Sequence, residues 1–584
     1  MRAFEQHKKR ERTLLNGFWQ FATDAEDRGV AESWYMGLPS SETVSVPSVW
    51  NTQLGLLTYE GAAFYQRTFD TDGGTLRFCF GGVMTDATVW LDDMLLGTHY
   101  GGFCQFDLIA KDVSAGTHRL TVRADNRFDA HSIPQKRVDW YHYGGICRDV
   151  EVERLSGVCT LCAHLEYELA ADYAAATYRF VLSLYNAETV EITTPLTLRL
   201  GDETVYQGSV TLTAGETVEW RSPEFALNAP RLWDPEDPYL YGIAVETATD
   251  GLCDRVGFRS VVVKPDGVYV NGHYVELRGV NRHEEHPDFG CSMPFGLIKR
   301  DIDIALDMNC NAIRTSHYPN SQLTADYCDE VGMLFWSEVP LWNRTVEAIA
   351  NPTLISRALD MEREMIEENY HHPSIIFFCV HNECATDTEE GYRLTEEMIR
   401  LAKELDSSRL VTYASNKVKS DERRERCYAL ADVVSVNHYI GWYFDVANED
   451  WDGFVRRYEE VLSSLDSSDK PFIMSEFGFA ALMGVNSFDY TRYGEDYQAD
   501  ALEFSLGQIL NNERLSGGYI WQMCDIRSEQ GDIARPRGFN NKGILDEYRR
   551  PKRAYRVVRR IYGEHLGIER NHYETVLYGY KKKI

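Results

Sequence analysis

The chain has 584 residues, of which 44% are hydrophobic and 26% are charged. This balance supports a large packed core and excludes a disordered or collagen-like protein, and the length predicts roughly three or four domains. Sixty Lys and Arg against 90 Asp and Glu give a net charge of −30. Because such a field does not attract polyanions, we predict no nucleic-acid partner and no membrane partner.

The N-terminal residues 1–12 are mostly charged and lack the apolar stretch of a secretory signal. No segment approaches the roughly 18 apolar residues that a membrane-spanning helix needs. The 13 cysteines are an odd number and lie scattered, as is typical of reduced thiols rather than of a disulfide framework. These features predict a soluble, cytoplasmic protein.

Residues 1–264 have the pattern of an all-β region. Short runs such as 88–91 and 118–122 alternate apolar and polar residues, and Gly-Gly and Asp-Gly pairs separate them. Regularly spaced short strands of this kind are typical of β-sandwiches. We predict two sandwiches, over residues 1–156 and 157–264.

From residue 265 onward, short apolar strands alternate with amphipathic helices, which indicates parallel β/α units. One helix is predicted over 294–309, where Ile298, Ile302, Ala305 and Leu306 share a face, and the last over 553–562. The strand candidates number eight and lie at residues 275–280, 312–315, 333–336, 375–380, 410–413, 433–436, 472–475 and 519–521. Residues 265–584 therefore fit a (β/α)8 barrel. The alternative, a doubly wound sheet, lacks the expected Gly-rich turn after a first strand.

Two carboxylates follow predicted strands of this barrel. Asn382 and Glu383 come after the fourth strand, and Glu476 follows the seventh. The catalytic residues of such barrels lie at the carboxyl ends of the strands. A carboxylate next to a buried strand costs free energy unless it is paired or used. Salt bridges at the barrel rim are the structural alternative, but two carboxylates at facing strand ends favour catalysis.

Paired carboxylates are what glycoside hydrolysis needs. One carboxyl group must carry a proton for the leaving oxygen, and the other must be ionised to attack the anomeric carbon. A separation of about 5–5.5 Å would indicate retention of configuration, and one of roughly 6.5–9.5 Å would indicate inversion.

Further segments extend this pattern into a resemblance to glycoside hydrolase family 2 that covers essentially the whole chain. They lie at residues 82–107, 233–241, 279–283 (Gly-Val-Asn-Arg-His) and 311–319 (Asn-Ala-Ile-Arg-Thr-Ser-His-Tyr-Pro). The resemblance implies a jelly-roll sugar-binding-type domain, an immunoglobulin-like sandwich and a catalytic barrel, in that order. It also implies that Glu383 is the general acid/base, that Glu476 is the nucleophile of a retaining mechanism, and that Asn382 binds the sugar 2-hydroxyl.

The same resemblance implies roles for five more residues. Tyr439 would lie against the nucleophile, and Trp521, after the eighth strand, would form the floor on which the sugar packs. Asp139 and His317 match positions that touch sugar hydroxyls or the carboxylate. Tyr443 would bind substrate, although an aromatic residue of the rim is a serious alternative for it.

The family contains β-galactosidases, β-mannosidases and β-glucuronidases, which the barrel alone does not separate. Asn540-x-Lys542 resembles the motif that marks β-glucuronidases. An ammonium and an amide side by side suit the substrate carboxylate, which a protein of net charge −30 does not otherwise attract. Family members also carry an arginine a few residues earlier, for which we favour Arg537 over Arg535.

We therefore expect a retaining exo-β-glucuronidase that acts by double displacement on small-molecule or oligosaccharide glucuronides. A β-galacturonidase or β-galactosidase of the same family is the alternative, and a non-catalytic carbohydrate-binding scaffold is a third possibility. We expect that no metal and no cofactor are required. The sequence leaves open whether a flavin binds away from the site, as in some relatives. Because family relatives form dimers and tetramers, we expect a homo-oligomer.

Overall fold

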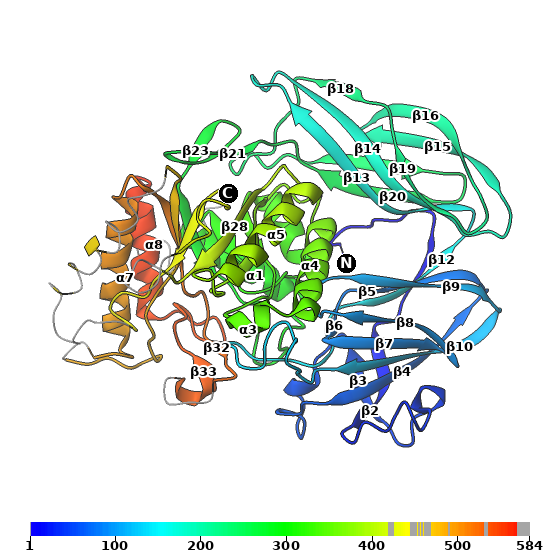
Figure 1. Cartoon of the computed structure of the whole chain (residues 1–584), viewed down its shortest axis with the longest axis horizontal. Coiled ribbons are helices and arrows are strands. Elements are labelled where there is room, and N and C mark those ends of the chain that lie inside the picture. Colours follow the sequence, from blue (N-terminus) through cyan, green and yellow to red (C-terminus); the bar gives the residue numbers. More distant parts are fainter. Residues whose placement is uncertain are drawn as a thin grey trace, which may run out of the picture.

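The computed structural model describes residues 2–417, 425–443, 453, 456, 459–460, 469–488, 491–530 and 535–568. Figure 1 shows two β-sandwiches on one side of a barrel that is surrounded by helices. This arrangement confirms the predicted fold class.

The first sandwich is built from two antiparallel sheets. The smaller sheet has the order β1 (Glu11–Leu14), β12 (Val150–Leu155), β5 (Gly74–Phe80) and β9 (Phe106–Val113). The larger sheet has the order β3 (Glu42–Val46), β2 (Gly17–Asp24), β4 (Ala62–Thr71), β10 (Gly116–Asp125), β7 (Asp86–Leu91) and β8 (Met94–Tyr100). A small ladder joins β6 (Val83–Met84) to β11 (Gly145–Ile146). Side chains alternate along each strand, so Leu120, Val122 and Ala124 of β10 all point into the core between the sheets.

The second sandwich has the same construction with fewer strands. One sheet contains β13 (Val158–Leu169), β14 (Ala175–Asn186), β17 (Thr217–Arg221) and β18 (Phe225–Asn228). The other has the order β16 (Glu203–Leu212), β15 (Ile192–Leu200), β19 (Tyr241–Glu246) and β20 (Gly251–Val256). A three-stranded sheet follows, of β21 (Val261–Lys264), β22 (Gly267–Val270) and β23 (His273–Val275). Val268 and Val270 of β22 pack with Leu277 and Tyr519 of the barrel, so this sheet covers the end at which the barrel strands begin.

The third unit is a closed barrel of eight parallel strands, which excludes the doubly wound sheet. Each strand overlaps a predicted one: β24 (Leu277–Asn281), β25 (Ala312–Arg314), β26 (Leu334–Glu338), β27 (Ile375–Asn382), β28 (Leu410–Ser415), β29 (Val434–Asn437), β30 (Phe472–Phe477) and β31 (Leu515–Ile520). The described helices are α1 (Phe295–Asp307), α2 (Gln322–Val331), α3 (Val346–Ile349), α4 (Pro352–Glu368), α5 (Glu389–Leu405), α7 (Glu495–Leu510) and α8 (Arg553–His565).

Local sequence explains where these helices lie and end. In α1, Ile298, Ile302 and Ala305 are buried on one face, as their spacing predicted, whereas Leu306 of the predicted face is only partly buried. Helix α2 begins at a serine cap, because the Ser321 side chain accepts a hydrogen bond from the Leu323 amide. It ends at Gly332, whose φ of 73° is in the left-handed region that favours glycine.

The carboxyl ends of the barrel strands open beside the first sandwich. After β31, the chain forms the hairpin of β32 (Ile526–Arg527) and β33 (Phe539–Asn540), which Figure 1 shows near the first sandwich. Trp140 and Tyr143 of the sandwich pack there with Tyr318 and Ile526 of the barrel. The first sandwich therefore forms one wall of the barrel mouth.

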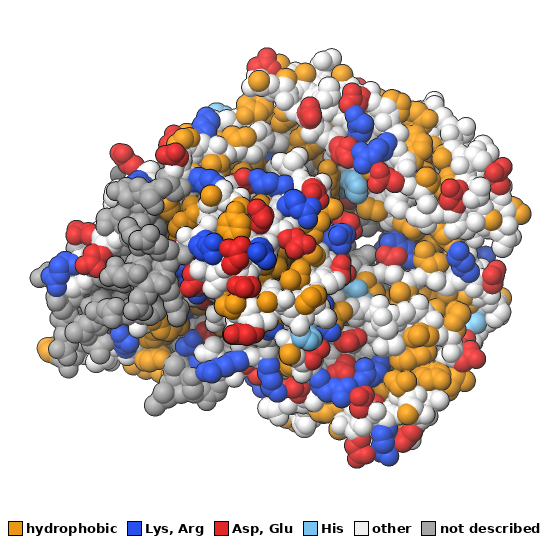
Figure 2. All heavy atoms as spheres, viewed as in Figure 1, with side chains coloured by type: hydrophobic (Ala, Val, Ile, Leu, Met, Phe, Trp, Pro, Cys, Tyr) orange, Lys and Arg blue, Asp and Glu red, His pale blue; other side chains and the backbone are white. Residues whose placement is uncertain are grey.

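On the face shown in Figure 2, acidic and basic side chains are mixed over all three units. No helix in the described part of the chain combines the length and the apolar character that a bilayer crossing requires.

Candidate active site

Glu383 directly follows β27, whose last residue is Asn382. Its backbone has a φ of 53°, which is unusual for a residue other than glycine. Asn437 Nδ2 donates to Glu383 Oε1 over 3.0 Å. Burial, and after it the nearby charge of Glu476, raises the pKa of Glu383 to about 7. This carboxyl group can therefore carry a proton near neutral pH.

Glu476 lies near the end of β30 and is held through both carboxylate oxygens. Arg314 Nη1 donates to Oε1 over 2.7 Å, and the Tyr439 hydroxyl donates to Oε2 over 2.6 Å. His317 Nε2 lies 3.8 Å from Oε1. These donors orient the carboxylate at the same end of the barrel as Glu383.

Arg314 and Glu338 form a buried ion pair that the sequence analysis did not assign to the site. Arg314 Nε and Nη2 donate to the two oxygens of Glu338 over 2.8 and 3.0 Å, a bidentate geometry. Burial alone would raise the pKa of Glu338. The charge of Arg314 and the contact with His317 have the larger combined effect, so the pKa is lowered to about 2. Arg314 Nη2 also donates to Asn382 Oδ1 over 2.8 Å. A single guanidinium thus positions both Asn382 and Glu476.

A cluster of aromatic rings lies beside Glu476, which His317 approaches to 3.8 Å. Trp521 follows β31 and stacks on His317, with ring centres 5.0 Å apart at an interplanar angle of 22°. His317 Nδ1 is 2.8 Å from Glu338 Oε1, and the Trp140 ring centre is 5.2 Å from that of His317. His283 meets Trp521 edge to face at 5.4 Å. Trp140 and His283 were not assigned to the site from the sequence.

Lys542 lies two residues beyond Asn540 and is buried among aromatic rings. Its Nζ donates to the Tyr443 hydroxyl over 2.6 Å and lies 4.6 and 5.5 Å from the ring centres of Tyr443 and Tyr439. No carboxylate among the described residues pairs with this ammonium. Burial, and after it the charge of Arg535, lowers the pKa of Lys542 to about 7.

Asp139 connects the first sandwich to this corner of the barrel. Arg535 Nε donates to Asp139 Oδ1 over 2.6 Å, and Asn540 Nδ2 donates to Oδ2 over 3.0 Å. Ser528 Oγ donates to Oδ1 over 3.0 Å. Arg535 Nη2 also lies 3.2 Å from the Tyr443 hydroxyl. The structure thus brings Asp139, Asn540, Lys542 and Tyr443 together, although they come from distant parts of the sequence.

Arg537, which the sequence analysis favoured, lies elsewhere. Its guanidinium pairs with Glu547 over 2.9 Å and donates to Asn541 over 3.2 Å, and its side chain is 48% exposed. Arg537 has a φ of 64° inside the turn Pro536–Gly538, so its side chain leaves the chain in another direction from that of Arg535. The arginine of this corner is therefore Arg535, and the preference for Arg537 was wrong.

One group of described residues has the composition of a metal site. The possible ligand atoms of Asp326, Asp329 and His372 lie within 4.8 Å of one another. Arg2 contacts His372 and lies 3.6 Å from Asp326, so a guanidinium of the chain itself already neutralises this group.

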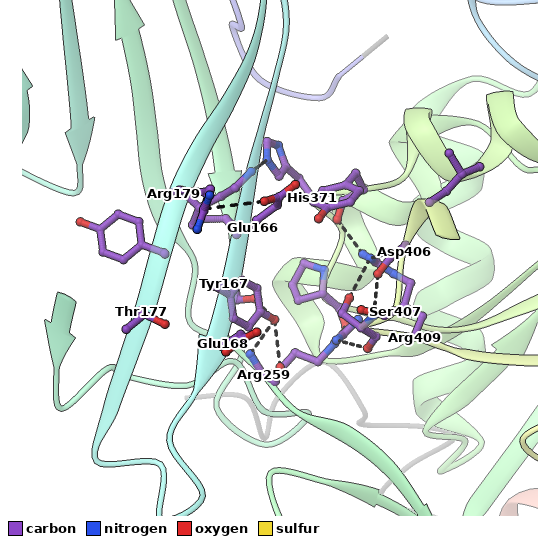
Figure 3. A pocket seen from close by; sticks show the side chains of 18 of the residues that line it. Glu166, Tyr167, Glu168, Thr177, Arg179, Arg259, His371, Asp406, Ser407 and Arg409 are labelled. Atoms are coloured by element: carbon purple, nitrogen blue, oxygen red, sulfur yellow. Dashed lines mark hydrogen bonds and ion pairs between the residues drawn. The ribbon is translucent and has the colours of Figure 1, made fainter. Parts of the chain in front are cut away.

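A cavity of about 310 Å³ lies between the second sandwich and the opposite end of the barrel (Figure 3). Arg259 donates there to the carbonyls of Pro373 and Ser408, and Arg409 pairs with Asp406. Pro373 precedes β27, and Asp406, Ser408 and Arg409 precede β28, so the cavity is at the end where strands begin, away from Glu383 and Glu476.

Comparison with known proteins gives matches along the chain. Three family descriptions match: "Glycosyl hydrolases family 2, sugar binding domain" at residues 12–155, "Glycosyl hydrolases family 2" at 163–259 and "Glycosyl hydrolases family 2, TIM barrel domain" at 261–565. A β-glucuronidase from Paenibacillus borealis is 25% identical, over 95% of this chain and 97% of that protein.

Two kinds of solved structure also match. The β-galacturonidase of Eisenbergiella tayi bound to galacturonate has a TM-score of 0.88 and 34% identity, over 96% of this chain and 99% of that chain. The β-glucuronidase of Ruminococcus gnavus in complex with D-glucuronic acid has a TM-score of 0.83 and 25% identity, over 96% of this chain and 98% of that chain.

Proposed function

Because the chain belongs to glycoside hydrolase family 2 and is thus a hydrolase of O-glycosyl bonds, we propose that it is a retaining exo-β-uronidase that cleaves β-D-glucuronides. The general class rests on the family. The reaction mechanism and the choice of sugar rest on the residues around the barrel mouth.

The observation that carries the choice of sugar is the buried ammonium of Lys542. It is only 1% exposed, and no described carboxylate lies within ion-pair distance of it, although the charges of Asp139 and Glu476 act on it from farther away. Burying an unpaired cation is costly, so this position calls for an anion from outside the chain. Asn540 and Arg535 lie beside it, where both also donate to Asp139. A carboxylate on the sugar ring would satisfy this group, whereas a hydroxymethyl group would not.

The two glutamates suit a double displacement. Glu383 would give its proton to the glycosidic oxygen while Glu476 attacks the anomeric carbon, so that the C–O bond breaks and the aglycone leaves as an alcohol. Glu383 would then take a proton from water, which attacks the anomeric carbon and frees Glu476. No acceptor lies within hydrogen-bond distance of Asn382 Nδ2 in the described structure, which suits a contact to the 2-hydroxyl.

A second candidate substrate is a β-galacturonide. The solved β-galacturonidase is 34% identical to this chain, against 25% for the solved β-glucuronidase. The two sugars carry the same carboxylate and differ in the configuration of the C4 hydroxyl, so Lys542 suits both.

A panel of nitrophenyl β-glycosides tests this proposal. Release of nitrophenol from the glucuronide or the galacturonide supports a uronidase, and their ratio of kcat/KM identifies the sugar. Turnover of the galactoside alone contradicts the carboxylate assignment. Proton NMR of the first product formed should show the β-anomer, because two displacements retain configuration. An α-anomer would contradict the role of Glu476 as nucleophile.

Three expectations from the sequence stay predictions. These are the cytoplasmic location, the homo-oligomeric state and catalysis without a cofactor. Size-exclusion chromatography with light scattering, and activity after dialysis against a chelator, would test the last two.

A further inference from the structure

Two cysteines meet where the first sandwich packs against the barrel. Cys147 directly follows β11 of the sandwich, and Cys291 lies in the segment between β24 and α1 of the barrel. Both side chains are buried in one cluster with Tyr143 and Tyr318. The thiol of Cys291 donates a hydrogen bond to the sulfur of Cys147, and both cysteines are free. The two thiols are thus in contact across the boundary between two units of the fold.

The backbone on each side holds this pair of thiols in place. The Cys147 amide donates to the Gly82 carbonyl over 3.1 Å, and Cys147 Sγ lies 3.4 Å from the same oxygen. On the barrel side, a Cβ added to Gly290 would lie 2.5 Å from the side chain of Val49 and 2.8 Å from the ring of Tyr143. The segment that carries Cys291 is therefore packed against the sandwich too closely to admit even a methyl group.

We propose that Cys147 and Cys291 are a modification site, at which a hydroperoxide oxidises the two thiols to a reversible disulfide that joins the first sandwich to the barrel. The site contains neither Glu383 nor Glu476. The inference does not depend on the proposed uronidase function.

The surroundings of the pair favour Cys147 as the sulfur that reacts first. The hydrogen bond from Cys291 lowers the pKa of Cys147, and the charge of Arg148 acts in the same direction, against the effect of burial. By contrast, burial raises the pKa of Cys310 and of Cys384 to about 12. Because the thiolate is the form that attacks peroxides, Cys147 suits the first step, and Cys291 is placed to resolve its product.

The reaction balances with hydrogen peroxide as the oxidant. The Cys147 thiolate attacks one peroxide oxygen, the O–O bond breaks, and the departing hydroxide takes up a proton to become water. Cys147 is then a sulfenic acid. The Cys291 sulfur attacks the sulfenic sulfur, the S–O bond breaks, and the oxygen leaves as a second water with the thiol proton. The two sulfurs together lose two electrons, which the peroxide gains.

The position of the pair gives the peroxide a short path and gives the bond a mechanical consequence. Cys291 lies two positions after Phe289, which is 43% exposed, so a small oxidant can approach from this side. A bond between Cys147 and Cys291 closes a loop of more than about 100 residues, which restricts the unfolded chain. The oxidised protein should therefore keep its sandwich on the barrel to a higher temperature than the reduced protein.

Peptide mapping of the full chain tests this inference. The reduced protein is treated with hydrogen peroxide, its remaining free thiols are alkylated, and it is digested without a reducing agent. Mass spectrometry should find the Cys147 and Cys291 peptides joined, with two hydrogens fewer than the separate peptides. The Tm should rise by about 2 °C or more, and dithiothreitol should reverse both changes.

Three variants provide the controls. Cys147→Ser and Cys291→Ser should each remove the joined peptides and the rise in Tm, whereas Cys162→Ser, which removes an exposed thiol, should keep both. Thermal unfolding under reducing conditions shows whether the variants are folded. If one is not, the peptide map of the wild type decides alone. Recovery of Cys147 and Cys291 as alkylated thiols, under conditions that oxidise Cys162, contradicts the inference. Oxidation of Cys147 to a sulfinic acid without a bond to Cys291 contradicts it as well.

Discussion

The phenol of Tyr439 donates a hydrogen bond of 2.6 Å to Oε2 of Glu476. The ammonium of Lys542 lies 5.5 Å from the centre of the same Tyr439 ring. One tyrosine therefore separates the proposed nucleophile from the proposed carboxylate-binding cation. A pyranose with its anomeric carbon at Glu476 and its acidic group at Lys542 would lie alongside this ring.

Replacement of the nucleophile should abolish turnover. In Glu476→Ala no carboxylate remains to attack the anomeric carbon, so kcat should fall by roughly four orders of magnitude or more. Added azide should restore cleavage of an activated aryl glycoside and give the α-glycosyl azide in a single displacement. Rescue that gives the β-azide would contradict this role for Glu476.

Replacement of the acid/base should depend on the leaving group. Glu383→Gln should reduce kcat/KM by about 10²–10⁴-fold for a methyl or alkyl β-uronide, whose leaving oxygen needs a proton. A dinitrophenyl β-uronide should lose far less in the first step, because its leaving group departs as a stable anion. Comparable losses for both substrates would mean that Glu383 is not the acid.

The pH profile should reflect the raised pKa of Glu383, which burial and the charge of Glu476 bring to about 7. The catalytic form is the protonated one, so kcat for an alkyl β-uronide should be retained below pH 7. It should fall by up to tenfold per pH unit above it. The Glu383→Gln variant should lack this alkaline limb. An unchanged limb in that variant would assign the titration to another group.

Substrate affinity should have its own pH dependence through Lys542, whose pKa is lowered to about 7 by burial and by Arg535. The groups that act on it are Arg535, Asp139 and Glu476, with the Tyr443 hydroxyl in contact. The charged form binds carboxylate, so the Kd for D-glucuronate should be lowest below pH 7 and rise above it. Calorimetry in buffers of different ionisation enthalpy should detect proton uptake on binding at pH 8. No proton uptake and a flat Kd would contradict this assignment.

Removal of the ammonium should affect one class of substrate. Loss of a buried charge partner costs about 3–5 kcal/mol, so Lys542→Ala should lower kcat/KM for uronides a few hundredfold or more. Any residual activity on a neutral galactoside should be unaffected. A change of less than about tenfold for uronides would contradict the carboxylate contact.

Two arginines in the same turn give a matched pair of variants. Arg535 is 7% exposed and pairs with Asp139, so Arg535→Ala should lower kcat/KM for uronides by about 100-fold or more. Arg537 forms a half-exposed ion pair with Glu547, which is worth about 0–1 kcal/mol, so Arg537→Ala should change activity less than about fivefold. Equal losses in the two variants would contradict the placement of Arg535.

The sequence predicted the barrel well because each strand carries its own signal. An apolar run such as 375–380 is recognisable without knowledge of its neighbours, and Asn382 and Glu383, two and three residues beyond it, then fall at the barrel mouth. Arg314 and Glu338 could have been found by the same reasoning, since each is a charged residue at the end of a buried strand.

Other features depended on information that the sequence does not contain. The choice between Arg535 and Arg537 depends on one backbone angle in a short turn, the φ of 64° at Arg537. The contact between Tyr443 and Lys542 joins residues 99 positions apart and requires the tertiary structure. Local patterns do not encode either of these.

The ion pair between Asp139 and Arg535 joins the first sandwich to the barrel. A chimaera that combines this barrel with the sandwich of a relative would leave Arg535 facing a foreign loop, unless the donor supplied an equivalent aspartate at that point. Evolution faces the same constraint, since recombination at the boundary between the units would separate two halves of the proposed binding site. The sandwich and the barrel should therefore be inherited as a single unit, with sugar preference changing through substitutions on both sides of their contact.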